Sequence, residues 1–147
     1  MANLQVKILK KSDNPLPEYV TEGSAGIDIS ANQAKKISIK PFERILIPTG
    51  LFIELPPDYQ ARIRPRSGLA IRSGISCLNS PGTIDSDFRG EINVILINLS
   101  HEEHYIARAD RVAKMIVSRI EKVKWRTAQK MSVTERNDGG FGHSGKS

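Results

Sequence analysis

The sequence predicts an all-β protein, built as a sandwich, a jelly roll or a barrel, with one short helix. Short segments in which apolar and polar residues alternate recur along the chain, and this is the period of a half-buried strand. Pro and Gly separate these segments at short intervals. The sequence has no internal repeat and no coiled-coil heptads, which would indicate other architectures.

The strands follow from this pattern in chain order. Within 59–65, alternation puts Tyr59, Ala61 and Ile63 on one face and the polar residues on the other. Residues 91–100 are nearly all apolar at their centre, which predicts a strand buried on both faces. The predicted strands are 4–9, 36–41, 44–55 (broken at Pro48, Thr49 and Gly50), 59–65, 91–100 and 111–120.

Two further segments complete the predicted organisation. Residues 67–74 read SGLAIRSG and favour a short helix. The Gly-rich residues near the C-terminus lie outside the strand pattern, so we expect a β domain over 1–134 and a flexible arm over 135–147.

Composition bounds the cellular setting and the partners. The chain has 147 residues, which favours one domain, and its apolar runs are too short to span a membrane. A single cysteine, Cys77, excludes an intramolecular disulfide and fits a reducing cytoplasm. The net charge of +6 suits nucleic acid or a small polyphosphate. Because the cations are scattered, with no run of five, we favour a local phosphate site over a nucleic-acid groove.

The pentapeptide RPRSG at 64–68 is the first candidate phosphate site. Arg66 has a planar fork of donors that matches phosphate oxygens, Ser67 offers a hydroxyl, and Gly68 allows close backbone approach. For these five residues taken alone, a turn carrying solvated arginines is the favoured interpretation.

The segment GTIDSDFRG at 82–90 is the candidate catalytic hairpin. Asp85 or Asp87 is suited to orient or deprotonate a water molecule. A calcium loop is excluded, because Arg89 and Leu96 occupy positions that require oxygen ligands. A plain turn closed by aspartate side chains remains the alternative.

Two other acidic segments have structural interpretations. In AGIDISA at 25–31, Asp28 lies between apolar neighbours, and a buried carboxylate there needs a partner such as an arginine. We therefore expect Asp28 to give structural support. The HEEH segment at 101–104 lacks further ligands for a metal and is interpreted as a solvated loop.

The C-terminal letters GGFGHSGKS match a P-loop pattern from Gly140. A P-loop follows a buried strand, whereas the preceding residues here are polar. Phe141, flanked by Arg136 and Lys146, instead suits a nucleobase and a phosphate chain, and a frayed Gly-rich tail is the alternative.

Taken together and in order, these segments resemble one family. AGIDISA, RPRSGLA, GTIDSDFRGEI, DRVAKMIV and RNDGGFGHSG look like the five motifs of the homotrimeric dUTP pyrophosphatases, the dUTPases, over residues 25–146. The resemblance implies a jelly-roll homotrimer with active sites shared between subunits and an arm that closes over a neighbour's site. The implied reaction cleaves dUTP to dUMP and diphosphate with Mg²⁺ held mainly by the triphosphate and water, limiting uracil in DNA and supplying dUMP for thymidylate synthesis.

The resemblance also implies roles for individual residues. Asp85 is expected to activate water for attack on the α-phosphate, and Asp28 to support the site. The residues expected to bind substrate are Arg66, Ser67, Gly68 and Lys114 at the phosphates, Asn79, Gly82, Ile84 and Phe88 in the uracil and sugar pocket, and Arg136, Phe141, Gly142, Ser144 and Gly145 in the arm.

Two positions depart from the family pattern. Phe88 stands where the family usually has Tyr, so a hydroxyl hydrogen bond is lost while packing under the sugar remains. Lys114 stands where the family usually has Gln, which adds a charge and removes an acceptor.

The alternatives are a dCTP deaminase of the same superfamily, a dUTP-binding regulatory trimer and a basic nucleic-acid-binding module. The first lacks its glutamate pattern, the second has no need for Asp85, and the third lacks a motif. A zinc deaminase is disfavoured further, because one cysteine cannot supply its metal site.

Overall fold

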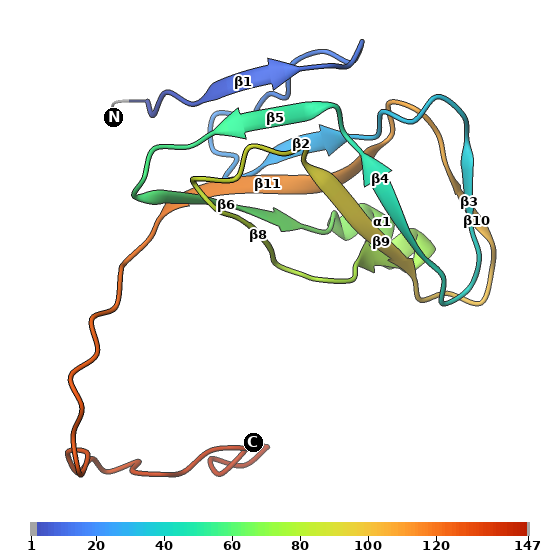
Figure 1. Cartoon of the computed structure of the whole chain (residues 1–147). Coiled ribbons are helices and arrows are strands. Elements are labelled where there is room, and N and C mark those ends of the chain that lie inside the picture. Colours follow the sequence, from blue (N-terminus) through green and yellow to red (C-terminus); the bar gives the residue numbers. More distant parts are fainter. Residues whose placement is uncertain (1–2, 147) are drawn as a thin grey trace.

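Two antiparallel sheets share one apolar core in the computed structural model, which describes residues 3–146 (Figure 1). The four-stranded sheet has the order β2 (Ile27–Ser30), β11 (Arg111–Arg119), β6 (Tyr59–Arg64) and β8 (Gly82–Ile84). The three-stranded sheet has the order β4 (Arg44–Pro48), β9 (Asn93–Asn98) and β7 (Ile75–Cys77). Two-stranded ribbons join β1 (Lys7–Lys10) to β5 (Leu51–Glu54) and β10 (His104–Ile106) to β3 (Ile37–Ile39). The predicted all-β fold is confirmed.

The period-2 pattern of β6 sets the orientation of the four-stranded sheet. Ala61 and Ile63 are buried in the core, whereas Arg62 and Arg64 are directed away from it, as predicted. The neighbouring strands follow the same alternation, with Ile29, Ala113 and Met115 buried. The other face of this sheet therefore carries the polar residues of β2 and β11, including Asp28 and Lys114.

The central strand β9 was predicted to be buried on both faces, and this is only partly correct. Val94, Leu96 and Asn98 are buried, whereas Ile95 and Ile97 are half-buried. β4 and β7 cover the two edges of β9, whereas its second face is only partly covered. Asn98 satisfies its amide by donating to the carbonyls of Ile39 and Glu102.

The predicted helix at 67–74 is confirmed as α1 (Ser67–Ser73). It ends at Gly74, whose φ of 65° is the left-handed conformation that glycine adopts without steric strain. The interpretation of residues 101–104 as a loop is wrong at its end, because His104 begins β10. The pairing of β10 with β3 and the buried Ile106 anchor this short strand.

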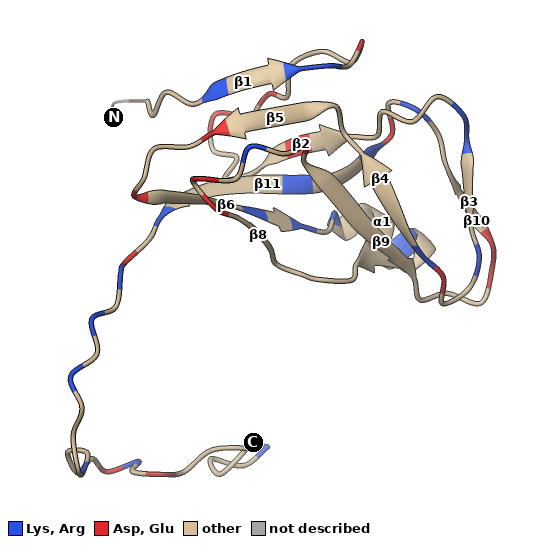
Figure 2. Ribbon diagram, viewed as in Figure 1, with Lys and Arg blue, Asp and Glu red and all other residues tan. Residues whose placement is uncertain are grey.

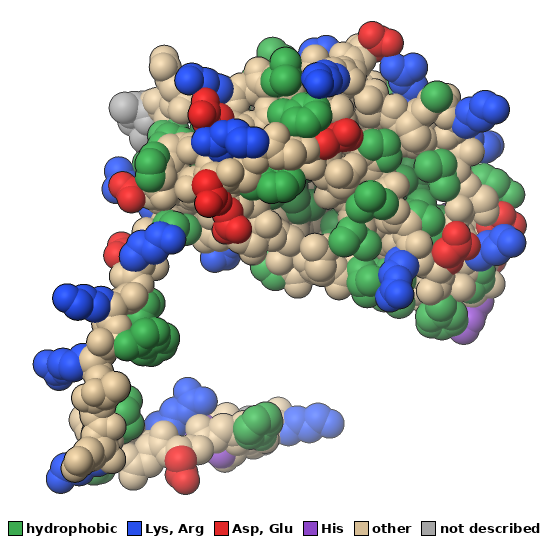
Figure 3. Space-filling model, viewed as in Figure 1, with side chains coloured by type: hydrophobic (Ala, Val, Ile, Leu, Met, Phe, Trp, Pro, Cys, Tyr) green, Lys and Arg blue, Asp and Glu red, His purple; other side chains and the backbone are tan. Residues whose placement is uncertain are grey.

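The chain leaves the sandwich where β11 ends. The Ile120 amide donates to the carbonyl of Asp58 over 2.9 Å, and residues 121–138 are exposed. Figures 1 and 3 show this segment standing away from the body, with apolar and basic side chains along it. The most exposed large apolar side chains in this segment are Val123, Trp125, Met131 and Val133. The expected division at residue 134 stays a prediction.

No helix among the described residues is long and apolar enough to cross a membrane.

Candidate functional site

The side chain of Asp28 lies at the centre of three cationic groups. Arg111 Nη1 donates a hydrogen bond to Oδ2 over 3.1 Å. Arg66 Nε and Lys114 Nζ both lie 3.6 Å from Oδ1, which is too far for a hydrogen bond. The Asp28 side chain is only 8% exposed. The expectation that this carboxylate pairs with an arginine is confirmed, since Arg66 and Arg111 both form ion pairs with it.

Sheet register brings these groups together. Lys114 on β11 pairs with Asp28 on β2 and with Arg64 on β6, so the three side chains form one row on the outer face of the sheet. Figure 2 shows the basic band on β11 beside the acidic band on β2. Arg66 follows the end of β6, and its Nη1 donates to the carbonyl of Arg111 over 3.1 Å.

Arg111 was not singled out from the sequence as a site residue. It pairs with Ser30, and the register of β11 against β2 shifts between Arg111 and Ala113. Such an irregularity re-aims the side chain of the residue beside it. Arg111 was detectable as the first residue of the RVAK segment, but its direction depends on this irregularity.

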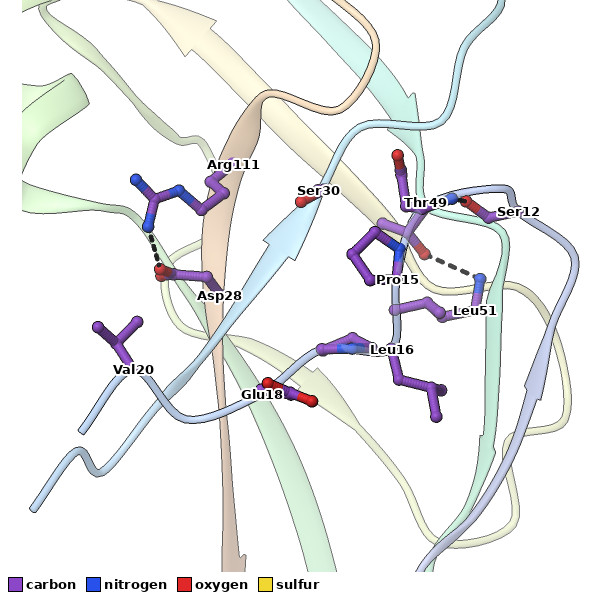
Figure 4. A pocket seen from close by; sticks show the side chains of 12 residues that line it. Ser12, Pro15, Leu16, Glu18, Val20, Asp28, Ser30, Thr49, Leu51 and Arg111 are labelled. Carbon is purple, nitrogen blue, oxygen red and sulfur yellow. Dashed lines mark hydrogen bonds and ion pairs between the residues drawn. The ribbon is translucent and has the colours of Figure 1, made fainter. Parts of the chain in front are cut away.

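We define Arg66, Arg111 and Lys114 as the cationic cluster, and its two arginines line two cavities. One of about 270 Å³ is lined by Asp28 and Arg111 together with residues 12–20, and Figure 4 shows Arg111 directed at Asp28 within it. Another of about 380 Å³ is lined by Arg66, Arg111 and the β10 segment. The cluster and Asp28 together carry a net charge of +2, and a site with this charge is suited to bind a polyanion.

One buried acceptor and one buried donor without hydrogen-bond partners strengthen this interpretation. Within residues 3–146, neither Asp28 Oδ1 nor Arg66 Nε has a hydrogen-bond partner, although both atoms are buried. Buried polar atoms without partners are uncommon and are often completed by a ligand or water. Ser67 and Gly68 open α1 directly after Arg66, so their polar groups lie next to the cluster in the chain.

The hairpin that was predicted to be catalytic follows β8 and includes Asp85 and Phe88. Gly82 and Ile84 are buried in β8, whereas Asn79, Asp85 and Phe88 are exposed. The Phe88 amide donates to the Asp85 carbonyl over 3.2 Å and closes the turn.

Arg89 fixes this hairpin to the neighbouring ribbon. Its guanidinium lies 3.2 Å from Glu54 on β5 and donates to the Ser86 carbonyl over 2.6 Å. Lys7 also lies 3.2 Å from Glu54. The Lys7 ammonium, and then Arg89, lower the pKa of the Glu54 carboxyl below its ordinary value.

The hairpin and the cationic cluster do not meet within one chain. Ile84, which precedes Asp85, pairs with Ala61, whereas Lys114 pairs with Arg64 at the other end of β6. Three residues of strand correspond to roughly 10 Å, and two strand spacings, together about 10 Å, separate β11, which carries Lys114, from β8.

The arm also lies apart from both groups. Its backbone forms successive turns, with the amides of Gly139, His143 and Gly145 donating to carbonyls three residues earlier. Arg136 Nε donates to the Gly139 carbonyl over 2.9 Å. Phe141, with a φ of 50°, is fully exposed, and Gly142 and Ser144 lie beside it in the turns.

No group of three or more His, Cys, Asp or Glu side chains in residues 3–146 is arranged to hold a metal ion. Asp28 is the carboxylate in contact with the cationic cluster. Because three cations surround it, direct binding of a divalent cation to this carboxylate is opposed. Any Mg²⁺ at this site would therefore be held by other ligands.

The chain is similar to known proteins over nearly its whole length. The dUTPase family model matches residues 12–145. The deoxyuridine 5'-triphosphate nucleotidohydrolase of Finegoldia magna is 50% identical over 142 residues, covering 97% of this chain and 99% of the relative. The enzyme of the same name from Fusobacterium nucleatum is 47% identical over 146 residues, covering 99% and 100%.

Solved structures give the same fold. A mutant dUTPase of bacteriophage 80alpha has a TM-score of 0.85 at 20% identity, covering 98% of this chain and all of that one. Another mutant of the Staphylococcus bacteriophage 80alpha enzyme, with dUpNHpp, has a TM-score of 0.83 at 20% identity with the same coverage.

Proposed function

The chain belongs to the dUTPase family and is a dUTP nucleotidohydrolase, and from this premise we propose which residues carry out the reaction. Arg66, Lys114 and the groups of Ser67 and Gly68 hold the phosphate chain. The observation that carries this assignment is the net charge of +2 on Asp28 and the three cations around it, with the buried Arg66 Nε lacking a hydrogen-bond partner in the described chain. Asp28 supports the site by keeping the three cations close together despite their mutual repulsion.

Asp85 activates the attacking water in this proposal. It is an exposed carboxylate at the end of a buried strand, so its oxygens are free to accept a proton from water. The water oxygen forms a bond to the α-phosphorus, its proton passes to Asp85, and the bond from the α-phosphorus to the bridging oxygen breaks. The products are dUMP and diphosphate.

The hairpin forms the base and sugar pocket. Asn79 and the backbone of Gly82 to Ile84 are proposed to pair with the uracil edge, and the ring of Phe88 to pack under the deoxyribose. A site built to pair with one base edge rejects another base because its buried polar groups are then left unpaired.

We propose that each active site is assembled from more than one copy of the chain, in a homotrimer. The separation along β6 and across the sheet supports this, because Asp85 cannot reach a phosphate held at the cluster of its own chain. The unpartnered apolar side chains of residues 121–134 support it too, since an extended segment of this kind gains stability by packing on another copy.

The arm, residues 135–147, is proposed to close over a neighbour's site. The exposed ring of Phe141 would stack on the uracil, while Arg136, Gly142, Ser144 and Gly145 would contact the phosphates. We also propose that the protein acts in the cytoplasm, supplying dUMP and limiting uracil in DNA, without nucleic acid or membrane as a partner.

Mg²⁺ belongs to the proposal as a ligand of the triphosphate and water. When bound there, it would neutralise part of the phosphate charge. The cations around Asp28 leave that carboxylate no role as a direct ligand.

The test is diphosphate release from dUTP with Mg²⁺, run beside dCTP, dTTP and UTP. Asp85→Asn is compared with Asp87→Asn, which removes the same charge two residues away. We expect selective dUTP turnover that falls by roughly two to four orders of magnitude in Asp85→Asn and is retained in Asp87→Asn. Equal turnover in both variants would remove Asp85 from the proposed role.

A further inference from the structure

Lys114 occupies the centre of the row of charged residues on the outer face of the sheet. Its register partner on β2 is Asp28 and its partner on β6 is Arg64. One neighbour attracts the ammonium and the other repels it, and Nζ accordingly lies 3.6 Å from Asp28 Oδ1.

The stem of Lys114 lies opposite Gly26 on the neighbouring chain segment. A Cβ on Gly26 would lie 3.4 Å from Lys114 Cβ and 3.6 Å from Cδ, so the glycine leaves the stem the space that a side chain there would contact. The side chain nevertheless remains 40% exposed, which keeps the ammonium accessible to a ligand.

Lys114 can leave Asp28 for another anion without leaving the Asp28 carboxylate unpaired. At 3.6 Å the ammonium makes no hydrogen bond to Oδ1, whereas Arg111 holds Oδ2 over 3.1 Å. Asp28 therefore keeps its hydrogen-bonded partner when Lys114 turns toward another anion. The Arg66 guanidinium, 3.6 Å from the same Oδ1, supplies a second compensating charge.

We propose that Lys114 moves from Asp28 to the phosphate chain and sets how tightly this enzyme holds polyphosphates, its diphosphate product included. The inference rests on the proposed function, which brings phosphates to the cationic cluster. The ammonium supplies one of the three positive charges of the cationic cluster, which a neutral Gln at this position would not supply. The expected consequences are strong inhibition by diphosphate and a marked dependence of that inhibition on salt.

The experiment measures inhibition of dUTP hydrolysis by inorganic diphosphate and by deoxyuridine, which has no phosphate, at low and high ionic strength. The variants are Lys114→Gln, Lys114→Arg and the control Lys40→Gln, which removes a charge from an exposed turn beside the other sheet. In Lys114→Gln we expect diphosphate inhibition to weaken roughly tenfold and to lose much of its salt dependence. Deoxyuridine inhibition should be unchanged, Lys114→Arg should retain diphosphate inhibition, and Lys40→Gln should match the unmodified chain.

Two results would overturn the inference while leaving the hydrolase intact. One is unchanged diphosphate inhibition in Lys114→Gln. The other is equal weakening of diphosphate and deoxyuridine inhibition, which would indicate a general disturbance of the site. Failure of the unmodified chain to release diphosphate from dUTP would instead count against the proposed function itself.

Discussion

Arg111 hydrogen-bonds to Asp28 over 3.1 Å, although its register partner on β2 is Ser30. The shift in register between Arg111 and Ala113 directs the guanidinium toward Asp28, two residues away on the same face of the strand. A local irregularity in β11 thus brings Arg111 into the cationic cluster.

Asp28→Asn is expected to destabilise the fold by about 1–3 kcal/mol, because it leaves three cations without a counter-charge around a buried side chain. The loss stays below that of a fully buried pair, since the cations are partly exposed. Urea unfolding measures this loss, and high salt should reduce the difference in free energy of unfolding between the unmodified chain and Asp28→Asn. The control Asp13→Asn removes a 93% exposed carboxylate paired with Arg108 and should cost about 0–1 kcal/mol. Equal effects of the two changes would contradict the central position of Asp28.

Gly90→Ala is expected to displace the ring of Phe88. A Cβ on Gly90 would lie 2.6 Å from the ring Cζ and 3.0 Å from Cε1, so the ring must move. We expect the KM for dUTP to rise several-fold and discrimination against UTP to weaken, because the ring is proposed to pack under the sugar. Steady-state kinetics test this, with Phe88→Ala as the background in which Gly90→Ala should have little further effect.

Phe141→Ala is expected to impair catalysis without affecting the fold. Because the ring is fully exposed, the free energy of unfolding should change by less than about 0.5 kcal/mol. The KM for dUTP should rise through loss of stacking on the base. A variant with normal KM would show that the ring does not stack on the base, and one with a lowered Tm would show a structural role instead.

Burial of Cys77 is expected to lower the free energy of unfolding at high pH. Burial raises the pKa of its thiol from 9.0 to about 11. The thiol of the unfolded chain ionises near its ordinary pKa while that of the folded chain stays neutral, so the free energy of unfolding falls as pH rises between these two values. Cys77→Ala should remove this pH dependence in urea titrations. The native thiol should also resist alkylation at pH 8, and rapid reaction there would contradict its burial.

Much of the fold was predictable because alternation identifies half-buried strands directly. The segments that became β6 and β11 carry a clear period of two, and the faces expected for Ala61 and Ile63 are those observed. Strands of three residues, such as β7 and β10, were not predicted, because three positions are too few for an alternating pattern to be recognised. Their formation depends on pairing with distant strands, which local sequence does not reveal.

The site was predictable from motif chemistry, but its geometry was not. Arg66 and Asp28 were each identified separately, yet their contact depends on strand order in the sheet. Arg111 was missed because its direction depends on the register shift. The separation of Asp85 from the cluster likewise follows from the register of β6, which no local pattern encodes.

The claim that one active site combines Asp85 of one chain with the cationic cluster of another is tested most directly by subunit mixing. Asp85→Asn and Arg66→Ala chains, each inactive alone, are unfolded together, refolded as a one-to-one mixture and assayed for dUTP hydrolysis. If neighbouring copies supply the two groups, about a quarter of the sites receive both intact, so about a quarter of normal activity should return. If a single chain supplies both groups, no site in the mixture is intact, and the absence of any recovered activity would contradict the account.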